Sequence, residues 1–248
     1  MLGAETRLVA LLGHPVAHSL SPRMQNAAFA ARALDWAYVA LDVAPDALGD
    51  AVRGLAAAGF AGANVTTPHK VAVHAFCDDL DDVAASAGSV NTLVFRDGRV
   101  VGASTDAEAL DEIEGSSAAI VGSGGAARAW RSALEARGFA VREYTRNGDW
   151  PPDATGADVV VHATPVVDEV LVEPSSAHAV VDLAYRADGG ETALVAAARA
   201  AGSRAIVDGF EVLVRQGAAS FERWTGIAAP VDLMRSAIRP VPGDPAVS

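Results

Sequence analysis

The chain has 248 residues, 51% of them hydrophobic and 20% charged, so it can bury a substantial core and is not expected to be disordered. A net charge of −12 argues against a nucleic-acid-binding surface and against binding to anionic membranes. A single cysteine, an N-terminus without a signal-peptide pattern and the lack of any apolar run of about 18 residues predict a soluble, cytoplasmic protein.

Strand and helix patterns alternate in the first part of the chain. One helix is predicted from Ser21-Pro22 to about Trp36, with Ser21 as its cap, and another from Pro45 to Gly59. An Asp97-Gly98 turn between two apolar runs predicts a β-hairpin. Buried strands are predicted at residues 7–13, 37–43 and 60–66. This β-α-β-α-β order is typical of a parallel sheet in an α/β fold.

Further elements complete a two-lobed α/β architecture with an active-site cleft expected between the lobes. An apolar run after Lys70 predicts a helix, and a short acidic helix is predicted over residues 105–115. Strands are predicted at 118–121, 139–145, 157–163, 179–184 and 204–208, and helices up to about Arg137 and over 191–201, 210–225 and 230–238. We place the boundary at the hinge-like segment 115–117. Residues 1–115 are then the substrate-binding and catalytic domain and 116–248 a Rossmann-like domain, whose closing helices (210–239) can pack back on the first.

A glycine-rich loop follows the predicted strand 118–121 and opens a helix. Its residues are Gly122, Ser123, Gly124, Gly125 and Ala126. Glycines let backbone amides approach a pyrophosphate, and the helix N-terminus adds a positive partial charge. The next strand ends in Thr145-Arg146 and not in the acid that binds NAD ribose, so NADP is favoured over NAD. The alternative readings are a tight turn without a ligand and a solvated arginine.

Polar residues gather where strands of the first lobe end. The four segments are His18–Ser21, Asn64–Lys70, Val90–Thr92 and Ser104–Asp106. Hydroxyls, an amide, a lysine and a carboxylate suit a small polyhydroxylated carboxylic acid, and Lys70 with Asp106 forms a reasonable proton-transfer pair. Taken alone, each residue has a plain structural explanation, such as a helix cap for Ser21 or a surface position for Lys70. Their joint occurrence favours a site.

These motifs together resemble the shikimate dehydrogenase family over nearly the whole chain. The matching stretches are residues 13–22, the Asn-Val-Thr-x-Pro-x-Lys motif at 64–70, Asn91-Thr92, Thr105-Asp106, the glycine loop at 122–126 and residues 208–218. The resemblance implies NADP-dependent, reversible reduction of 3-dehydroshikimate to shikimate, with Lys70 and Asp106 as the catalytic pair. It implies a small-molecule substrate and a monomer or homodimer.

The resemblance also implies roles for other residues. Substrate contacts are expected from Ser19, Ser21, Thr66, Asn91, Tyr185 and Gln216. Cofactor contacts are expected from the glycine loop, Thr145, Arg146, Thr164 and Gly209. The alternatives are a quinate or aminoshikimate dehydrogenase and, in another class, a non-catalytic protein that binds a shikimate-like ligand.

Several positions depart from the family pattern. Gln25 stands where a histidine is usual, and Val166-Val167 replaces the usual glycine after Thr164-Pro165. The histidines lack metal-ligand spacing, so no metal is expected. The run Asp78–Asp82 is interpreted as a solvated helical face or turn.

Overall fold

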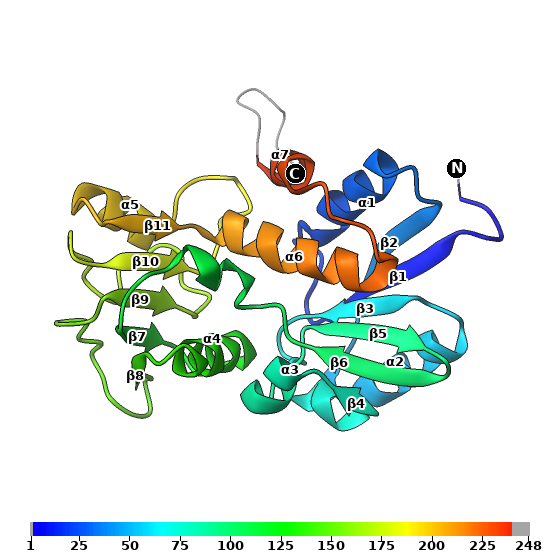
Figure 1. The fold of residues 1–248 in the computed structure, drawn as a ribbon, viewed down its shortest axis with the longest axis horizontal. Coiled ribbons are helices and arrows are strands. Elements are labelled where there is room, and N and C mark those ends of the chain that lie inside the picture. The colour runs from blue at the N-terminus through cyan, green and yellow to red at the C-terminus, as the bar shows by residue number, and fades with distance from the viewer. Residues whose placement is uncertain (1, 240–248) are drawn as a thin grey trace. The chain divides into compact units, whose positions relative to one another are not determined.

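The computed structural model describes residues 2–239, which form two compact units. One unit contains the chain up to Asp106 together with Val214–Ile238, and the other contains Ala107–Leu213 with Arg239. The compact units therefore divide after Asp106, whereas the domain boundary predicted near residue 115 stays a prediction. Helix α6 (Gly209–Thr225) begins in the second unit and ends in the first (Figure 1).

The first unit is built on a six-stranded mixed sheet in the order β2-β1-β3-β5-β6-β4. Strand β1 (Arg7–Gly13) pairs in parallel with β2 (Trp36–Asp42) and β3 (Gly62–Val65), which confirms the predicted parallel core. The predicted hairpin is also confirmed: β5 (Thr92–Arg96) and β6 (Arg99–Ala103) are antiparallel, and Gly98 adopts a φ of 73° in the turn. Because β5 runs antiparallel to both β3 and β6, β6 ends at the same edge of the sheet as β1 and β3.

Helices cover this sheet, and three predictions about them are wrong. Helix α1 (Ser21–Ala31) has Leu20 as its N-cap, so Ser21 lies inside the first turn and caps nothing. The same helix ends at Ala31 because the chain must turn, through Ala33 at a φ of 53°, to start β2. The apolar run after Lys70 forms only the 3₁₀ helix η2 (Ala72–Phe76).

The remaining elements of the first unit are short. They are the 3₁₀ helix η1 (Pro45–Ala47), α2 (Leu48–Ala57), β4 (Asp79–Leu80), α3 (Asp82–Ala87) and α7 (Val231–Ile238). The acidic run 78–82 is thus divided between a strand and a helix start. Asp81 is the N-cap of α3 and accepts a hydrogen bond from the Ala84 backbone N–H at 2.8 Å.

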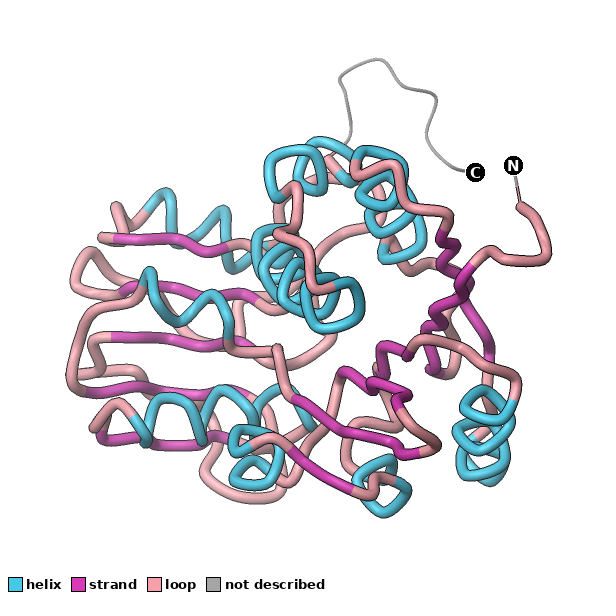
Figure 2. Tube along the Cα trace, turned by 45° about the vertical axis from the view of Figure 1, so that its right-hand side comes forward, coloured by secondary structure: helices cyan, strands magenta, loops and turns pink. Residues whose placement is uncertain are grey.

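The second unit is a five-stranded, fully parallel sheet in the order β11-β10-β9-β7-β8 (Figure 2). The strands are β7 (Ser117–Val121), β8 (Ala140–Tyr144), β9 (Val159–His162), β10 (Ala179–Asp182) and β11 (Ala205–Val207). The helices are η3 (Glu108–Glu112), α4 (Gly125–Ala136) and α5 (Ala193–Ala200), besides the start of α6. From β7 the chain goes to β8 on one side and then to β9 on the other, so the direction of winding reverses at β7.

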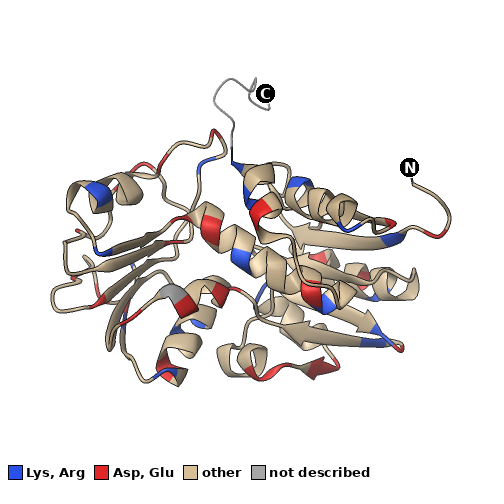
Figure 3. Ribbon diagram, turned by 45° about the horizontal axis from the view of Figure 1, so that its top comes forward, with Lys and Arg blue, Asp and Glu red and all other residues tan. Residues whose placement is uncertain are grey.

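Both faces of this parallel sheet are covered, which explains its uninterrupted apolar strands. On β7, Ala118 and Ile120 pack into one core cluster with Trp130 of α4. Ala119 and Val121 pack on the opposite face with Leu194 of α5. Charged residues lie mainly on helices, turns and strand ends (Figure 3). The two core clusters hold the strands in register. The positions at which the loops leave the carboxyl edge of the sheet are therefore fixed.

Candidate active site

Lys70 and Asp106 form a nearly buried ion pair in the first unit. The Lys70 Nζ atom lies 2.6 Å from Asp106 Oδ1 and 2.8 Å from Oδ2, and the two side chains are 16% and 7% exposed. Lys70 follows β3 and Asp106 follows β6, and both strands end at the same edge of the sheet. The topology therefore brings together two groups that are 36 residues apart. Lys70 is also the only lysine in the chain.

Asn91 holds the carboxylate of this pair. It precedes β5, which starts at the edge where β3 and β6 end. Its side-chain amide donates to Asp106 Oδ1 at 3.0 Å, and its Oδ1 accepts from the Thr105 backbone N–H at 2.8 Å. The same amide lies 3.2 Å from Oε1 of Gln216, which comes from the part of α6 that belongs to the first unit. Four predicted site residues thus meet in one hydrogen-bonded cluster: Lys70, Asn91, Asp106 and Gln216.

Beneath this cluster lies a buried polar network, of which the sequence indicated Asn64 and Thr92 but not Tyr38 or Ser220. Ser220 Oγ lies 2.8 Å from Thr92 Oγ1 and accepts from Asn64 Nδ2 at 3.0 Å. The Tyr38 hydroxyl donates to Asn64 Oδ1 at 2.9 Å, and burial raises the pKa of this phenol. Ser220 follows Gln216 by one helical turn, so i, i+4 spacing was the available signal. The network fixes α6 against the strand ends that carry Lys70 and Asp106.

The predicted substrate residues Ser19 and Thr66 lie in loops that follow β1 and β3, and Ser21 begins α1. Ser19 Oγ accepts a hydrogen bond from the Ser21 backbone N–H at 3.3 Å. A Cβ placed on Gly13 would collide with the methyl carbon of Thr66, so the loop after β1 packs tightly against the turn after β3. The hydroxyl-bearing loops therefore belong to the same part of the unit as Lys70.

The glycine loop of the second unit has the backbone of an anion site. Gly124 is the N-cap of α4 without a side-chain cap, and nothing lies within 4 Å of a Cβ built on it. Gly122 has a φ of 122°, and its Cβ would stand 2.7 Å from the Ala163 carbonyl oxygen, so only glycine fits there. Open space over uncapped helix amides suits a pyrophosphate. Ser123, Gly125 and Ala126 complete this loop and the first turn of α4.

Two other predicted cofactor residues follow β8, which is the neighbour of β7. Thr145 and Arg146 come directly after that strand, at the carboxyl edge where the glycine loop also lies. Arg146 is exposed, and its guanidinium carbon lies 5.9 Å from the centre of the Trp150 ring. A guanidinium held near an aromatic ring at this edge is suited to a nucleotide phosphate.

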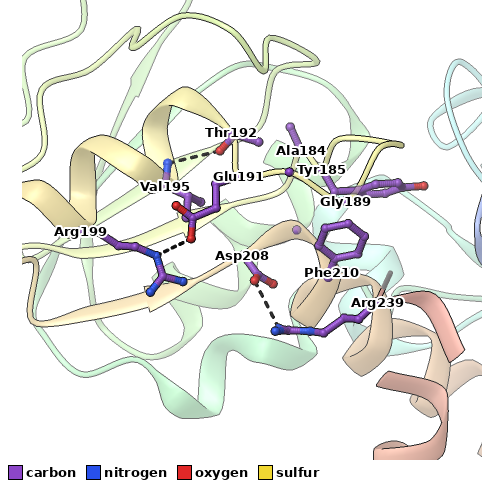
Figure 4. A pocket seen from close by; sticks show the side chains of 12 residues that line it. Ala184, Tyr185, Gly189, Glu191, Thr192, Val195, Arg199, Asp208, Phe210 and Arg239 are labelled. Atoms are coloured by element: carbon purple, nitrogen blue, oxygen red, sulfur yellow. Dashed lines mark hydrogen bonds and ion pairs between the residues drawn. The ribbon is translucent and has the colours of Figure 1, made fainter. Parts of the chain in front are cut away.

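The remaining predicted residues, Thr164, Tyr185 and Gly209, lie after β9, β10 and β11 in the second unit. Thr164 follows β9, and its hydroxyl lies 2.5 Å from Nε2 of His162. Tyr185 and Gly209 line a cavity of about 240 Å³ (Figure 4). The ring of Phe210 lies 5.4 Å from that of Tyr185, and Gly209 approaches the Ala184 carbonyl so closely that a Cβ there would collide with it. The ion pairs Glu191–Arg199 and Asp208–Arg239 also line this cavity.

Among the side chains that the structure describes within residues 2–239, no three histidine, cysteine or acidic groups are placed so that they could hold a metal ion. None of the helices in this part of the chain has both the length and the apolar composition needed to cross a bilayer.

Comparisons with known proteins agree on one family. Residues 11–93 match the shikimate dehydrogenase substrate-binding domain, and residues 209–239 match the shikimate 5'-dehydrogenase C-terminal domain. The shikimate dehydrogenase (NADP(+)) of Anaeromyxobacter dehalogenans strain 2CP-1 is 42% identical and covers 95% of this chain and 97% of its own length. That of Methanopyrus kandleri is 40% identical, with coverages of 95% and 96%.

Solved structures of similar proteins share the fold of this chain. The shikimate 5-dehydrogenase of Thermus thermophilus in complex with NADP(H) and shikimate has a TM-score of 0.82 and 32% identity, covering 94% of this chain and 98% of that one. The ligand-free 5-ketofructose reductase of Gluconobacter sp. strain CHM43 has a TM-score of 0.83 at 25% identity, covering 95% and 99%. With relatives above 40% identity aligned over almost its full length, the chain belongs to the shikimate dehydrogenase family.

Proposed function

We propose that this protein catalyses the NADP-dependent, reversible reduction of 3-dehydroshikimate to shikimate. The observation that carries the proposal is the pair formed by Lys70 and Asp106, in which both carboxylate oxygens contact one ammonium and Asn91 braces the carboxylate. An ammonium held in this way is a proton donor of fixed direction. The names of the relatives and the glycine loop support the choice of cofactor.

Lys70 has the donors that the reaction requires. An ammonium carries three N–H groups, and two of them are directed at Asp106, which leaves one without a partner among the described residues. That third N–H is available to the carbonyl oxygen that becomes the alcohol. As negative charge develops on this oxygen, a fixed cation stabilises the transition state more than the neutral ketone. Asp106 keeps the ammonium oriented throughout.

The rest of the site would hold the two ligands. Ser19, Ser21, Thr66, Asn91 and Gln216 supply hydroxyl and amide groups for the substrate's hydroxyls and carboxylate, and Tyr185 is a further proposed contact. The open amides at the start of α4 would hold the NADP pyrophosphate, with Thr145 and Arg146 at the 2′-phosphate and Thr164 and Gly209 at the nicotinamide. When bound, NADPH supplies the hydride.

Initial rates with purified protein test this proposal. The absorbance of the reduced nicotinamide is followed with shikimate, quinate, aminoshikimate and the reduced form of 5-ketofructose, each with NADP and with NAD. We expect the highest kcat/KM with shikimate and NADP. A higher kcat/KM with another compound would show that this compound, and not shikimate, is the preferred substrate. Binding of shikimate without turnover on either nucleotide would instead favour the non-catalytic alternative. The cytoplasmic location and the monomeric or homodimeric state stay predictions.

A further inference from the structure

We propose that His162 is a positioning residue for the nicotinamide half of NADP and that it acts through the hydroxyl of Thr164. The inference rests on the proposed function, because it assumes that the dinucleotide binds at the carboxyl edge of the second sheet. It concerns a row of hydrogen-bonded side chains that runs from Asp182 through His162 to Thr164, of which the predicted cofactor set included only Thr164.

The chain is set up by two paired strands. Residues His162 of β9 and Asp182 of β10 lie opposite each other, and they are 1% and 0% exposed. His162 Nδ1 lies 2.8 Å from Asp182 Oδ1, and its Nε2 lies 2.5 Å from the Thr164 hydroxyl. Every polar atom of the imidazole is therefore in a hydrogen bond, as burial demands.

The hydrogen bonds of Asp182 determine where the protons lie. Its carboxylate accepts from the Thr192 hydroxyl at 2.5 Å and from the Ala184 backbone N–H at 3.0 Å, besides its contact with His162. When the imidazole is neutral, its proton therefore lies on Nδ1, because an ionised carboxylate only accepts, and Nε2 presents a lone pair. Thr164 must then donate its only proton to His162.

Because its only proton is donated to His162, the Thr164 hydroxyl can only accept further hydrogen bonds. One lone pair of its oxygen faces the backbone N–H of Val166 at 3.3 Å. The other is available at the partly buried surface of the loop that follows β9. The carboxamide of nicotinamide carries two N–H donors, which is the chemistry that such an acceptor recognises.

The topology supports this location. In open parallel sheets, ligands bind where the winding direction reverses, in the crevice between the two diverging loops. Here those loops follow β7 and β9, which are neighbours in the sheet. They also touch, because the Ala163 carbonyl oxygen lies 2.7 Å from the Cβ position of Gly122. Thr164 therefore follows directly on the residue that contacts the glycine loop.

Binding measurements with two probes separate this role from a purely structural one. NADPH contains the nicotinamide, whereas 2′,5′-ADP contains only the adenosine end of the cofactor. The variants are Thr164→Val, which removes the hydroxyl at constant shape, and His162→Asn, which keeps a donor for Asp182 but is too short to reach Thr164. The double variant and Thr164→Ser, which restores a hydroxyl, complete the set.

His178→Asn is the matched control. His178 is a buried histidine of the same unit, with its Nδ1 accepting from the Ser175 backbone N–H at 3.1 Å, and it precedes β10 at the opposite edge of the sheet. This control distinguishes the general effect of losing a buried imidazole from the specific effect of losing His162. Urea unfolding of every variant establishes that each is folded under the conditions of the titrations.

We expect Thr164→Val and His162→Asn each to weaken NADPH binding about fivefold to tenfold, the effect of one hydrogen bond. The double variant should be no weaker than either single one, because both remove the same interaction. Binding of 2′,5′-ADP should stay within about twofold, as should both ligands with Thr164→Ser and His178→Asn.

Equal loss of both probes, additive effects in the double variant, or unchanged NADPH binding by Thr164→Val would each overturn the inference. If His162→Asn does not fold, Thr164→Val can still overturn the inference, by leaving NADPH binding unchanged. These outcomes are distinct from a failure of the proposed function, which would appear as a wild-type protein that does not reduce 3-dehydroshikimate with NADPH.

Discussion

Replacing Lys70 by methionine removes the ammonium and keeps most of the side-chain volume. The change deletes both contacts with Asp106, at 2.6 and 2.8 Å, and with them the only proton donor that the cluster directs with a fixed charge. Proton transfer by a positioned group contributes about 10²- to 10⁴-fold to a rate, which corresponds to about 3–5 kcal/mol in the barrier. We expect kcat for shikimate oxidation to fall by that factor, while KM for shikimate changes only a few-fold.

The same variant should also be less stable. It leaves the carboxylate of Asp106, whose side chain is 7% exposed, with Asn91 as its main remaining donor. Breaking a fully buried pair costs about 3–5 kcal/mol, and because Lys70 is 16% exposed we expect a loss of roughly 2–3 kcal/mol. Urea unfolding measures it.

A second positive residue provides the control for this experiment. Arg53→Met breaks an exposed ion pair with Asp50, whose partners are 67% and 85% exposed, and it should change neither kcat nor stability beyond about 0.5 kcal/mol. If Lys70→Met retained kcat within tenfold of wild type, the assignment of Lys70 as the proton donor would be wrong, whatever happened to the stability.

Three further predictions address other parts of the chain. Arg146→Gln should raise KM for NADP by at least about tenfold and leave KM for NAD within twofold, because only NADP carries the 2′-phosphate; equal effects on both nucleotides would remove Arg146 from the cofactor site. Trp130→Ala should lower the free energy of unfolding by about 3–5 kcal/mol, because the ring is fully buried between α4 and the second sheet, and a loss below about 1 kcal/mol in a denaturant titration would contradict that packing. Burial, and secondarily the charge of Asp78, raises the pKa of Cys77 to about 11, so roughly one thiol in a thousand is ionised at pH 8; alkylation by iodoacetamide, followed by mass spectrometry, should be at least about a hundredfold slower in the folded protein than in urea.

The sequence predicted those elements whose signals are local. The apolar runs of β1 and β7 and the Asp97-Gly98 turn needed no tertiary information, because a strand buried on both faces and a tight turn each limit the residue types they accept. Ser21 was misassigned as a cap because a serine next to a proline fits both N-cap and first-turn positions. Capping depends on where the chain enters the helix, which no local pattern specifies.

The candidate site divides in the same way. Lys70, Asn91, Asp106 and the glycine loop stand in motifs of short span and could be named from the sequence. Asn64 and Ser220 are 156 residues apart, and their contact exists only because α6 packs on the edge of the first sheet. His162 was considered only as a metal ligand and set aside. Its pairing with Asp182 follows from strand register, which periodicity does not reveal.

The presence of one lysine in the whole chain has a practical consequence. This sequence contains only two primary amines that an amine-specific reagent could modify, the α-amine and the Lys70 side chain. Reductive methylation with a carbon-13 label would therefore give a spectrum with two signals, one of which reports directly on the proposed proton donor. Its titration curve and its response to shikimate could be read without assigning any other resonance.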